Sequence, residues 1–76
     1  MKDRIIKILN EVRPEFNFGT EINFISQGML DSFDLVTLVT ELDESFGISI
    51  DGTDILPQNF ESVEAIEALL KKNGAQ

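Results

Sequence analysis

Three segments of this chain carry apolar residues at helical spacing, which restricts the fold to a small bundle of helices. The strongest segment is Ser32–Phe46, where one face at about 100° per residue holds the apolar residues Leu35, Leu38, Val39, Leu42 and Phe46. A first helix is predicted from Lys2 to about Arg13, because Pro14 disfavours helical backbone in the residue before it. A last helix is predicted from about Ser62, a favourable N-cap, to Asn73, with Gly74 ending it.

The connections between these helices complete the predicted architecture. Residues 14–31 form a long connection, and such loops are uncommon unless they are packed or functional. It has enough apolar residues to lie as an ordered loop across the helices: Phe16, Phe18, Ile22, Phe24, Ile25 and Leu30. Ile48–Ile50 is expected to be an extended linker, because a lone strand is not stable. Thr53–Leu56 is expected to form a short helical turn stopped by Pro57. The prediction is one all-α domain over residues 1–76, with three main helices, one short helix and a long ordered first loop.

The residue types that are missing restrict the function. The chain has no Cys and no His, so disulfides and zinc sites of the usual ligands are excluded. It also lacks a thiol nucleophile, the commonest general base and a Ser-His-Asp triad. A core this small leaves little room for a pocket that encloses a substrate. We therefore expect no catalytic residues and no metal site, and predict that the chain is not an enzyme.

The net charge of −8 is unevenly distributed along the sequence. Residues 14–70 contain no basic side chain, and all six lie near the ends: Lys2, Arg4, Lys7, Arg13, Lys71 and Lys72. This distribution argues against nucleic acid and against anionic membrane surfaces as partners. The acidic middle suits partners with basic patches, although acidity also serves solubility alone. No apolar run is long enough to span a membrane or to form a signal peptide, so we expect a cytoplasmic protein without membrane insertion.

One short segment carries the functional prediction. Residues 28–34 read Gly-Met-Leu-Asp-Ser-Phe-Asp and place the hydroxyl of Ser32 where the long loop meets the helix predicted at 32–46. Asp31 or Ser32 can serve as N-cap, and Asp34 adds a negative charge to the first turn, where the helix dipole favours it. Taken alone, the pattern indicates only the start of a helix.

In context, this segment resembles the attachment motif of the acyl carrier protein family. Residues 46–50 (Phe-Gly-Ile-Ser-Ile) and 61–66 (Glu-Ser-Val-Glu-Ala-Ile) also resemble that family, and the likeness covers nearly the whole chain. It implies that Ser32 is esterified with 4′-phosphopantetheine, taken from coenzyme A by a phosphopantetheinyl transferase. Asp31 would help that transferase to hold its magnesium ion. The arm would then carry an acyl or aminoacyl group as a thioester, with Ser32 as its anchor.

The exposed face of the helix at 32–46 is the predicted partner-binding surface, comprising Phe33, Asp34, Val36, Thr37, Thr40, Glu41 and Glu44. Phe33 stands where the family usually has Leu or Met, and Thr37 where its fatty-acid members usually have an acid. The expected partners are the transferase, an acyl or aminoacyl ligase or acyltransferase, and synthase enzymes with basic patches. We expect the carrier to be a monomer.

Several alternatives remain open at this stage. Fatty acyl, polyketide, aminoacyl and D-alanyl carriers share this scaffold, and the run from Gly28 to Ser32 is closest to ligase-loaded carriers, including the D-alanyl ones. One set of apolar residues could line a space for an acyl chain or form ordinary core: Val36, Val39, Ile50, Ile55, Ala65 and Ile66. The rival function is an acidic helical adaptor without a prosthetic group. A calcium loop at residues 43–54 is disfavoured, because the ligand spacing and the glycine at the sixth position are missing.

Overall fold

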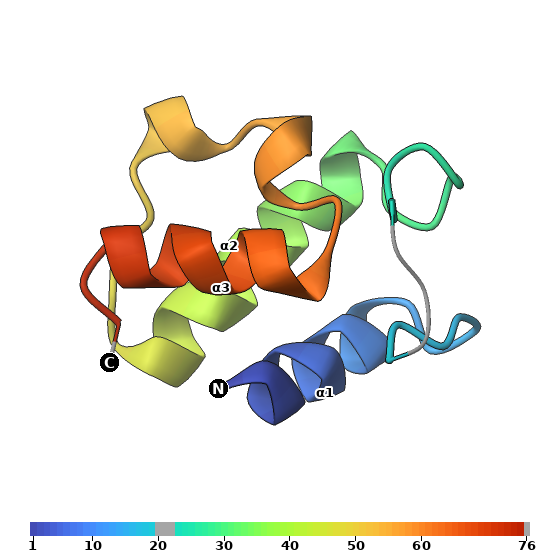
Figure 1. The fold of residues 1–76 in the computed structure, drawn as a ribbon, viewed down its shortest axis with the longest axis horizontal. Coiled ribbons are helices and arrows are strands. Elements are labelled where there is room, and N and C mark those ends of the chain that lie inside the picture. The colour runs from blue at the N-terminus through green and yellow to red at the C-terminus, as the bar shows by residue number, and fades with distance from the viewer. Residues whose placement is uncertain (20–22, 76) are drawn as a thin grey trace.

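The computed structural model describes residues 1–19 and 23–75. It contains three α-helices, α1 (Lys2–Val12), α2 (Ser32–Phe46) and α3 (Val63–Lys72), and two 3-10 turns, η1 (Gly52–Asp54) and η2 (Pro57–Asn59) (Figure 1). The predicted all-α bundle is confirmed, and the described residues include no strand. Within the same residues, no helix has the length and apolar character needed to cross a membrane.

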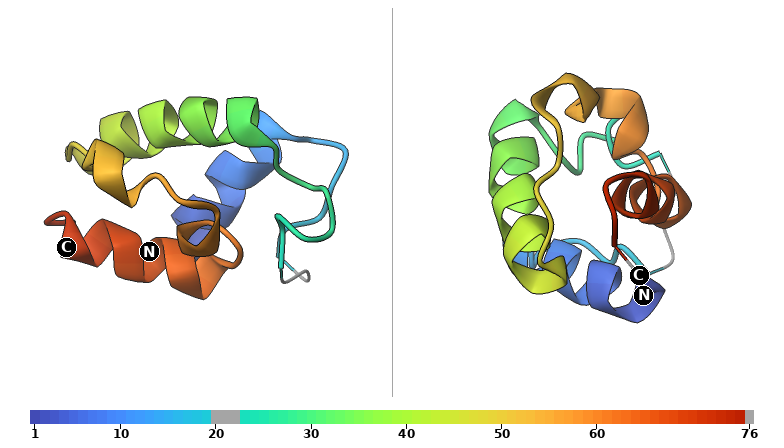
Figure 2. Two further views of the ribbon diagram at one scale, coloured as in Figure 1. Left: turned by 90° about the horizontal axis from the view of Figure 1, so that it is seen from above. Right: turned by 90° about the vertical axis from the view of Figure 1, so that its left-hand side faces the viewer.

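The helices surround one hydrophobic core. α1 packs against both α2 and α3, and Figure 2 shows α2 and α3 on opposite sides of the core, with η1 and η2 closing it. Fully buried large side chains come from all three helices, from the first loop and from the segment before α3: Ile5, Leu9, Phe18, Phe24, Leu38, Leu42, Phe60, Ile66 and Leu70. Each such side chain contributes about 1.5–3 kcal/mol relative to an exposed one, and this burial stabilises a chain that has no cysteine and so no disulfide.

The long first loop is packed onto the core, as its apolar residues predict. Phe18 and Phe24 are fully buried, and their rings meet edge to face at 4.9 Å. The amide of Phe24 donates to the carbonyl of Glu61 (2.8 Å), which ties the loop to the segment before α3. Met29 is also buried, although it was not among the apolar residues predicted to pack the loop. Ile22, expected to help pack the loop, lies outside the described residues.

Helix boundaries agree with the predictions to within about one residue. α1 ends at Val12, so Arg13 is its C-cap rather than its last residue. Ser62 is the N-cap of α3 and accepts a hydrogen bond from the amide of Ala65 (3.0 Å). α2 ends at Gly47, whose φ of 64° lies in the left-handed region that glycine adopts without strain. Residues 48–50 are extended and unpaired, as expected.

The segment between Gly47 and α3 differs from its prediction. The single turn expected at Thr53–Leu56, stopped by Pro57, is wrong, because η1 ends at Asp54 and Pro57 begins a second turn. The physical reason is that proline needs no hydrogen-bond partner for its nitrogen at the first helical position, and its fixed φ suits that position. Asp51 is the N-cap of η1, since its side chain accepts a hydrogen bond from the amide of Thr53 (2.9 Å).

Candidate functional site

Ser32 is the first residue of α2, and its side chain is exposed. Of the two N-cap candidates, Asp31 takes that position, so the Ser32 hydroxyl is not needed for capping. Across residues 1–19 and 23–75, the hydroxyl has no hydrogen-bond partner. The structure therefore presents a free hydroxyl at the N-terminus of the longest helix.

Asp31 and Asp34 fix the backbone around this serine through a reciprocal pair of hydrogen bonds. The amide of Asp34 donates to Oδ1 of Asp31 (2.9 Å), and the amide of Asp31 donates to Oδ2 of Asp34 (3.1 Å). This is the capping-box arrangement, with Asp in place of the more frequent Glu or Gln at its third position. Ser32 lies inside the ring that these two bonds close.

A third side chain, Arg13, reaches the same site from the end of α1. Its Nη1 lies 2.6 Å from Oδ2 of Asp34, while its Nε lies 2.8 Å from Oε2 of Glu15. The hydrogen bonds to Glu15 and then to Asp34 raise the pKa of Arg13 above its ordinary value. The guanidinium also lies over the ring of Phe16, at 5.2 Å from its centroid. Arg13 was not among the predicted site residues, and the only signal for it in the sequence is that no basic residue follows it until Lys71.

The bonds of Asp34 change its expected role. The sequence placed Asp34 on the partner-binding surface, but only 16% of its side chain is exposed, and its Oδ2 accepts from both Asp31 and Arg13. A carboxylate held in this way belongs to the start of the helix rather than to a surface open to partners. We therefore leave Asp34 out of the surface described below.

The other residues of the predicted surface are exposed. Phe33 is 83% exposed and Val36 63%, which agrees with a face of α2 turned away from the core. Thr37 and Thr40 lie on the same face, and their hydroxyls donate to the carbonyls of Phe33 (3.3 Å) and Val36 (3.1 Å). Their protons are thus used within the helix. The expectation that Val36 lines an interior space is wrong, because its side chain faces solvent.

The remaining residues expected to line an interior space are part of the packed protein. Val39, Ile50 and Ile66 are buried in the core, Ile55 packs against it, and Ala65 is half-buried. These positions are what ordinary core packing also requires. Sequestration of an acyl chain among them stays a prediction.

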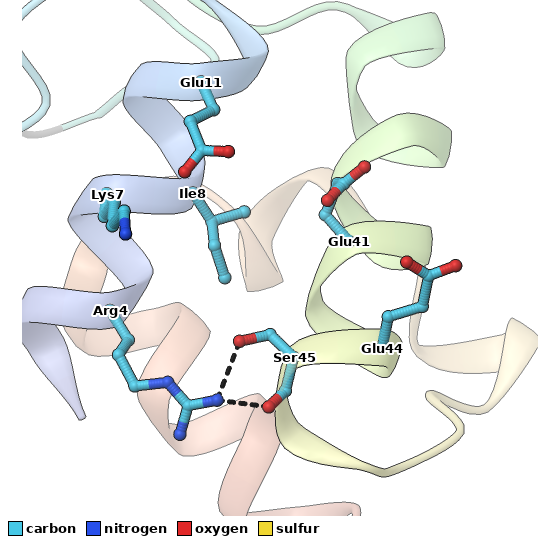
Figure 3. A pocket seen from close by; sticks show the side chains of 7 residues that line it. All are labelled: Arg4, Lys7, Ile8, Glu11, Glu41, Glu44 and Ser45. Carbon is cyan, nitrogen blue, oxygen red and sulfur yellow. Dashed lines mark hydrogen bonds between the residues drawn. The ribbon is translucent and has the colours of Figure 1, made fainter.

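Glu41 and Glu44 line a groove of about 330 Å³ between α1 and α2 (Figure 3). The opposite wall comes from α1, and the full lining is Arg4, Lys7, Ile8, Glu11, Glu41, Glu44 and Ser45. Nη2 of Arg4 donates to the carbonyl and to the hydroxyl of Ser45, which closes one end of the groove. At a rise of about 1.5 Å per residue, Glu44 is about 18 Å along the helix from Ser32.

The described residues thus form a small helical bundle that exposes an unbonded serine at the start of a capped helix. A family model described as a phosphopantetheine attachment site matches residues 2–70, and the chain belongs to this family. Proteins of this family carry covalently attached 4′-phosphopantetheine and typically have no catalytic activity. The resemblance to acyl carrier proteins is thereby confirmed. No curated protein and no solved structure matched the chain.

Proposed function

We propose that this protein carries acyl or aminoacyl groups as thioesters on a 4′-phosphopantetheine arm attached to Ser32 and delivers them to partner enzymes. One observation carries the proposal. In a chain of the phosphopantetheine attachment family, the Ser32 hydroxyl is exposed and unbonded at the first position of a rigidly capped helix. The chain itself performs no catalysis in this proposal.

The surroundings of Ser32 fit a phosphodiester. The capping box uses the amides of Asp31 and Asp34, while those of Ser32 and Phe33 have no partner in the described part of the chain. These two amides lie at the positive end of the helix dipole, where a phosphate is stabilised. When bound, the group supplies a thiol, which a chain without cysteine lacks.

The modification is a phosphoryl transfer in which Ser32 is the acceptor. Its Oγ forms a bond to the phosphorus of the pantetheine phosphate of coenzyme A, and the P–O bond within the diphosphate breaks. The adenosine bisphosphate portion leaves, and the hydroxyl proton passes to a base supplied by the phosphopantetheinyl transferase. Asp31 is adjacent to the acceptor and exposed, so we propose that it helps the transferase to hold its magnesium ion.

Partner enzymes would bind the exposed face of α2, which we call the docking face: Phe33, Val36, Thr37, Thr40, Glu41 and Glu44. Its end nearest Ser32 is apolar, with Phe33 and Val36, and its far end is acidic. A partner with a basic patch beside an apolar contact would therefore be oriented with its active site near the arm. The proposed partners are the transferase, a ligase or acyltransferase that loads the arm, and the enzymes that receive the cargo.

The test is the intact mass of the protein after coexpression with a phosphopantetheinyl transferase. We expect an increase equal to one phosphopantetheine group for the wild type and none for Ser32→Ala. Ser49→Ala is a matched control, because Ser49 is also exposed, and it should be modified fully. An unmodified wild type would favour the adaptor function, and a modified Ser32→Ala variant would move the attachment to another residue.

A further inference from the structure

The end of α1 is joined to the start of α2 by one side chain. Arg13 follows the last residue of α1, and its guanidinium reaches Asp34 across 21 positions of sequence with a distance of 2.6 Å. Both partners are largely shielded, since their side chains are only 26% and 16% exposed. A charge-assisted contact of this length is short even for an ion pair, and partial burial protects it from screening by salt.

The contact is continuous with the hydrogen bonds that surround the proposed acceptor. The same oxygen, Oδ2 of Asp34, accepts from Arg13 and from the amide of Asp31, while the amide of Asp34 donates back to Asp31. If the carboxylate of Asp34 turns away, the amide of Asp31 loses its partner. The backbone on both sides of Ser32 is therefore held in place by a carboxylate that Arg13 orients.

No other basic side chain of the described residues is bonded at this site. Lys72 pairs with Asp54 (2.8 Å), Lys2 with Glu64 (3.6 Å), and Arg4 is bonded to Ser45. Residues 14–70 contain neither Lys nor Arg. The charge of Arg13 is thus the one that offsets Asp34 when a further negative charge, the phosphodiester, arrives at Ser32.

We infer that Arg13 is a positioning residue for the modification of Ser32, acting through Asp34; this inference rests on the proposed function. The guanidinium orients Asp34, Asp34 and Asp31 fix the first turn of α2, and that turn aims the Ser32 hydroxyl at the donor. Small displacements of a reacting group slow a transfer strongly, because the gain from orientation is lost. Arg13 should therefore affect the chemical step more than the binding of the carrier to its transferase.

The experiment measures kcat and KM of a phosphopantetheinyl transferase, with coenzyme A as the donor and the carrier as the varied substrate. For Arg13→Gln we expect kcat to fall by about fivefold or more and KM to change by less than about twofold. Arg13→Lys should recover part of kcat, since lysine restores the charge but not the planar guanidinium that bonds Asp34. In an Asp34→Ala background, Arg13→Gln should have no further effect, because its path to Ser32 is already cut.

Two controls separate this role from general stabilisation. Lys72→Met removes one positive charge and an ion pair of 2.8 Å, remote from Ser32 in sequence and not bonded to α2. Glu15→Gln removes the other carboxylate that Arg13 contacts while leaving Asp34 in place. Both variants should keep the wild-type kcat, and all variants are assayed well below their melting temperatures.

The outcomes distinguish the proposed function from the positioning role of Arg13. A wild type that the transferase never modifies would contradict the proposed function itself. With a wild type that is modified, an unchanged kcat for Arg13→Gln overturns the positioning role alone. The role is also overturned if Arg13→Gln retains its full effect in the Asp34→Ala background, or if Lys72→Met lowers kcat equally.

Discussion

The replacement of Phe33 by alanine should separate partner binding from folding. Phe33 is 83% exposed, whereas Phe60 has the same side chain with no exposed area. Surface substitutions of this kind change stability by no more than about 0.5 kcal/mol, while removal of a core phenylalanine costs about 3–5 kcal/mol. The higher helix propensity of alanine offsets even the small loss at Phe33.

These magnitudes convert into melting temperatures that are easily resolved. For a domain of this size, 1 kcal/mol shifts the melting temperature by about 4–8 °C. Phe33→Ala should therefore remain within about 4 °C of the wild type, and Phe60→Ala should melt at least about 12 °C lower. Circular dichroism gives the two melting temperatures side by side, and the comparison is matched because both variants replace a phenylalanine by alanine.

The same Phe33→Ala variant should bind partners more weakly. Aromatic side chains at the centre of an interface often contribute more than 1 kcal/mol, so kcat/KM for modification or for loading should fall by about fivefold or more. If Phe33→Ala melts as low as Phe60→Ala, the assignment of α2 faces is wrong. If it melts normally and every partner enzyme uses it at the wild-type rate, Phe33 does not belong to the docking face.

Three further predictions concern charge, backbone and pH. Glu41→Lys combined with Glu44→Lys should slow association with a basic partner most at low salt. A difference in association rate that does not depend on ionic strength would contradict an electrostatic role of these two residues. Gly47→Ala should lower the free energy of unfolding by about 1 kcal/mol, measured with denaturant, because φ at this position is 64°. A variant as stable as the wild type would refute the expected backbone strain of alanine at this position. Hydrogen bonds from the Thr53 amide and hydroxyl lower the pKa of Asp51, so its contribution to stability is present above the unfolded pKa and is lost as pH falls through the lower folded one. Asp51→Asn should therefore make the free energy of unfolding less sensitive to acid. If the loss of stability at acid pH is the same as in the wild type, these hydrogen bonds do not contribute as described.

Much of the fold could be predicted because the long helices are amphipathic and end at residues with clear conformational preferences. Leu35, Leu38 and Leu42 mark the buried face of α2 by period alone, and Gly47 marks its end. The exposure of Ser32 and Phe33 follows from the same period. These features depend on interactions within one helix, which the local sequence contains.

The parts that could not be predicted depend on short elements or on distant contacts. A turn of three residues has too few positions for a period, so the role of Pro57 in opening η2 was missed. The bond from Arg13 to Asp34 depends on the path of the 19-residue connection between α1 and α2 (residues 13–31), which no local pattern encodes. Asp34 was assigned to the surface for the same reason. The sequence shows its place on the helix but not that Arg13 covers its side chain.

Both ends of α2 are held by arginines, one in α1 and the other at its C-cap. Arg13 is bonded to Asp34 in the first turn, and Arg4 is bonded to the carbonyl of Ser45 in the last turn and lies over the ring of Phe46 (4.3 Å). At the C-terminal end the charge of Arg4 suits the helix dipole, since the last turn of α2 has no basic residue of its own. These contacts therefore hold α2 at both of its ends, while α1 also packs against α3.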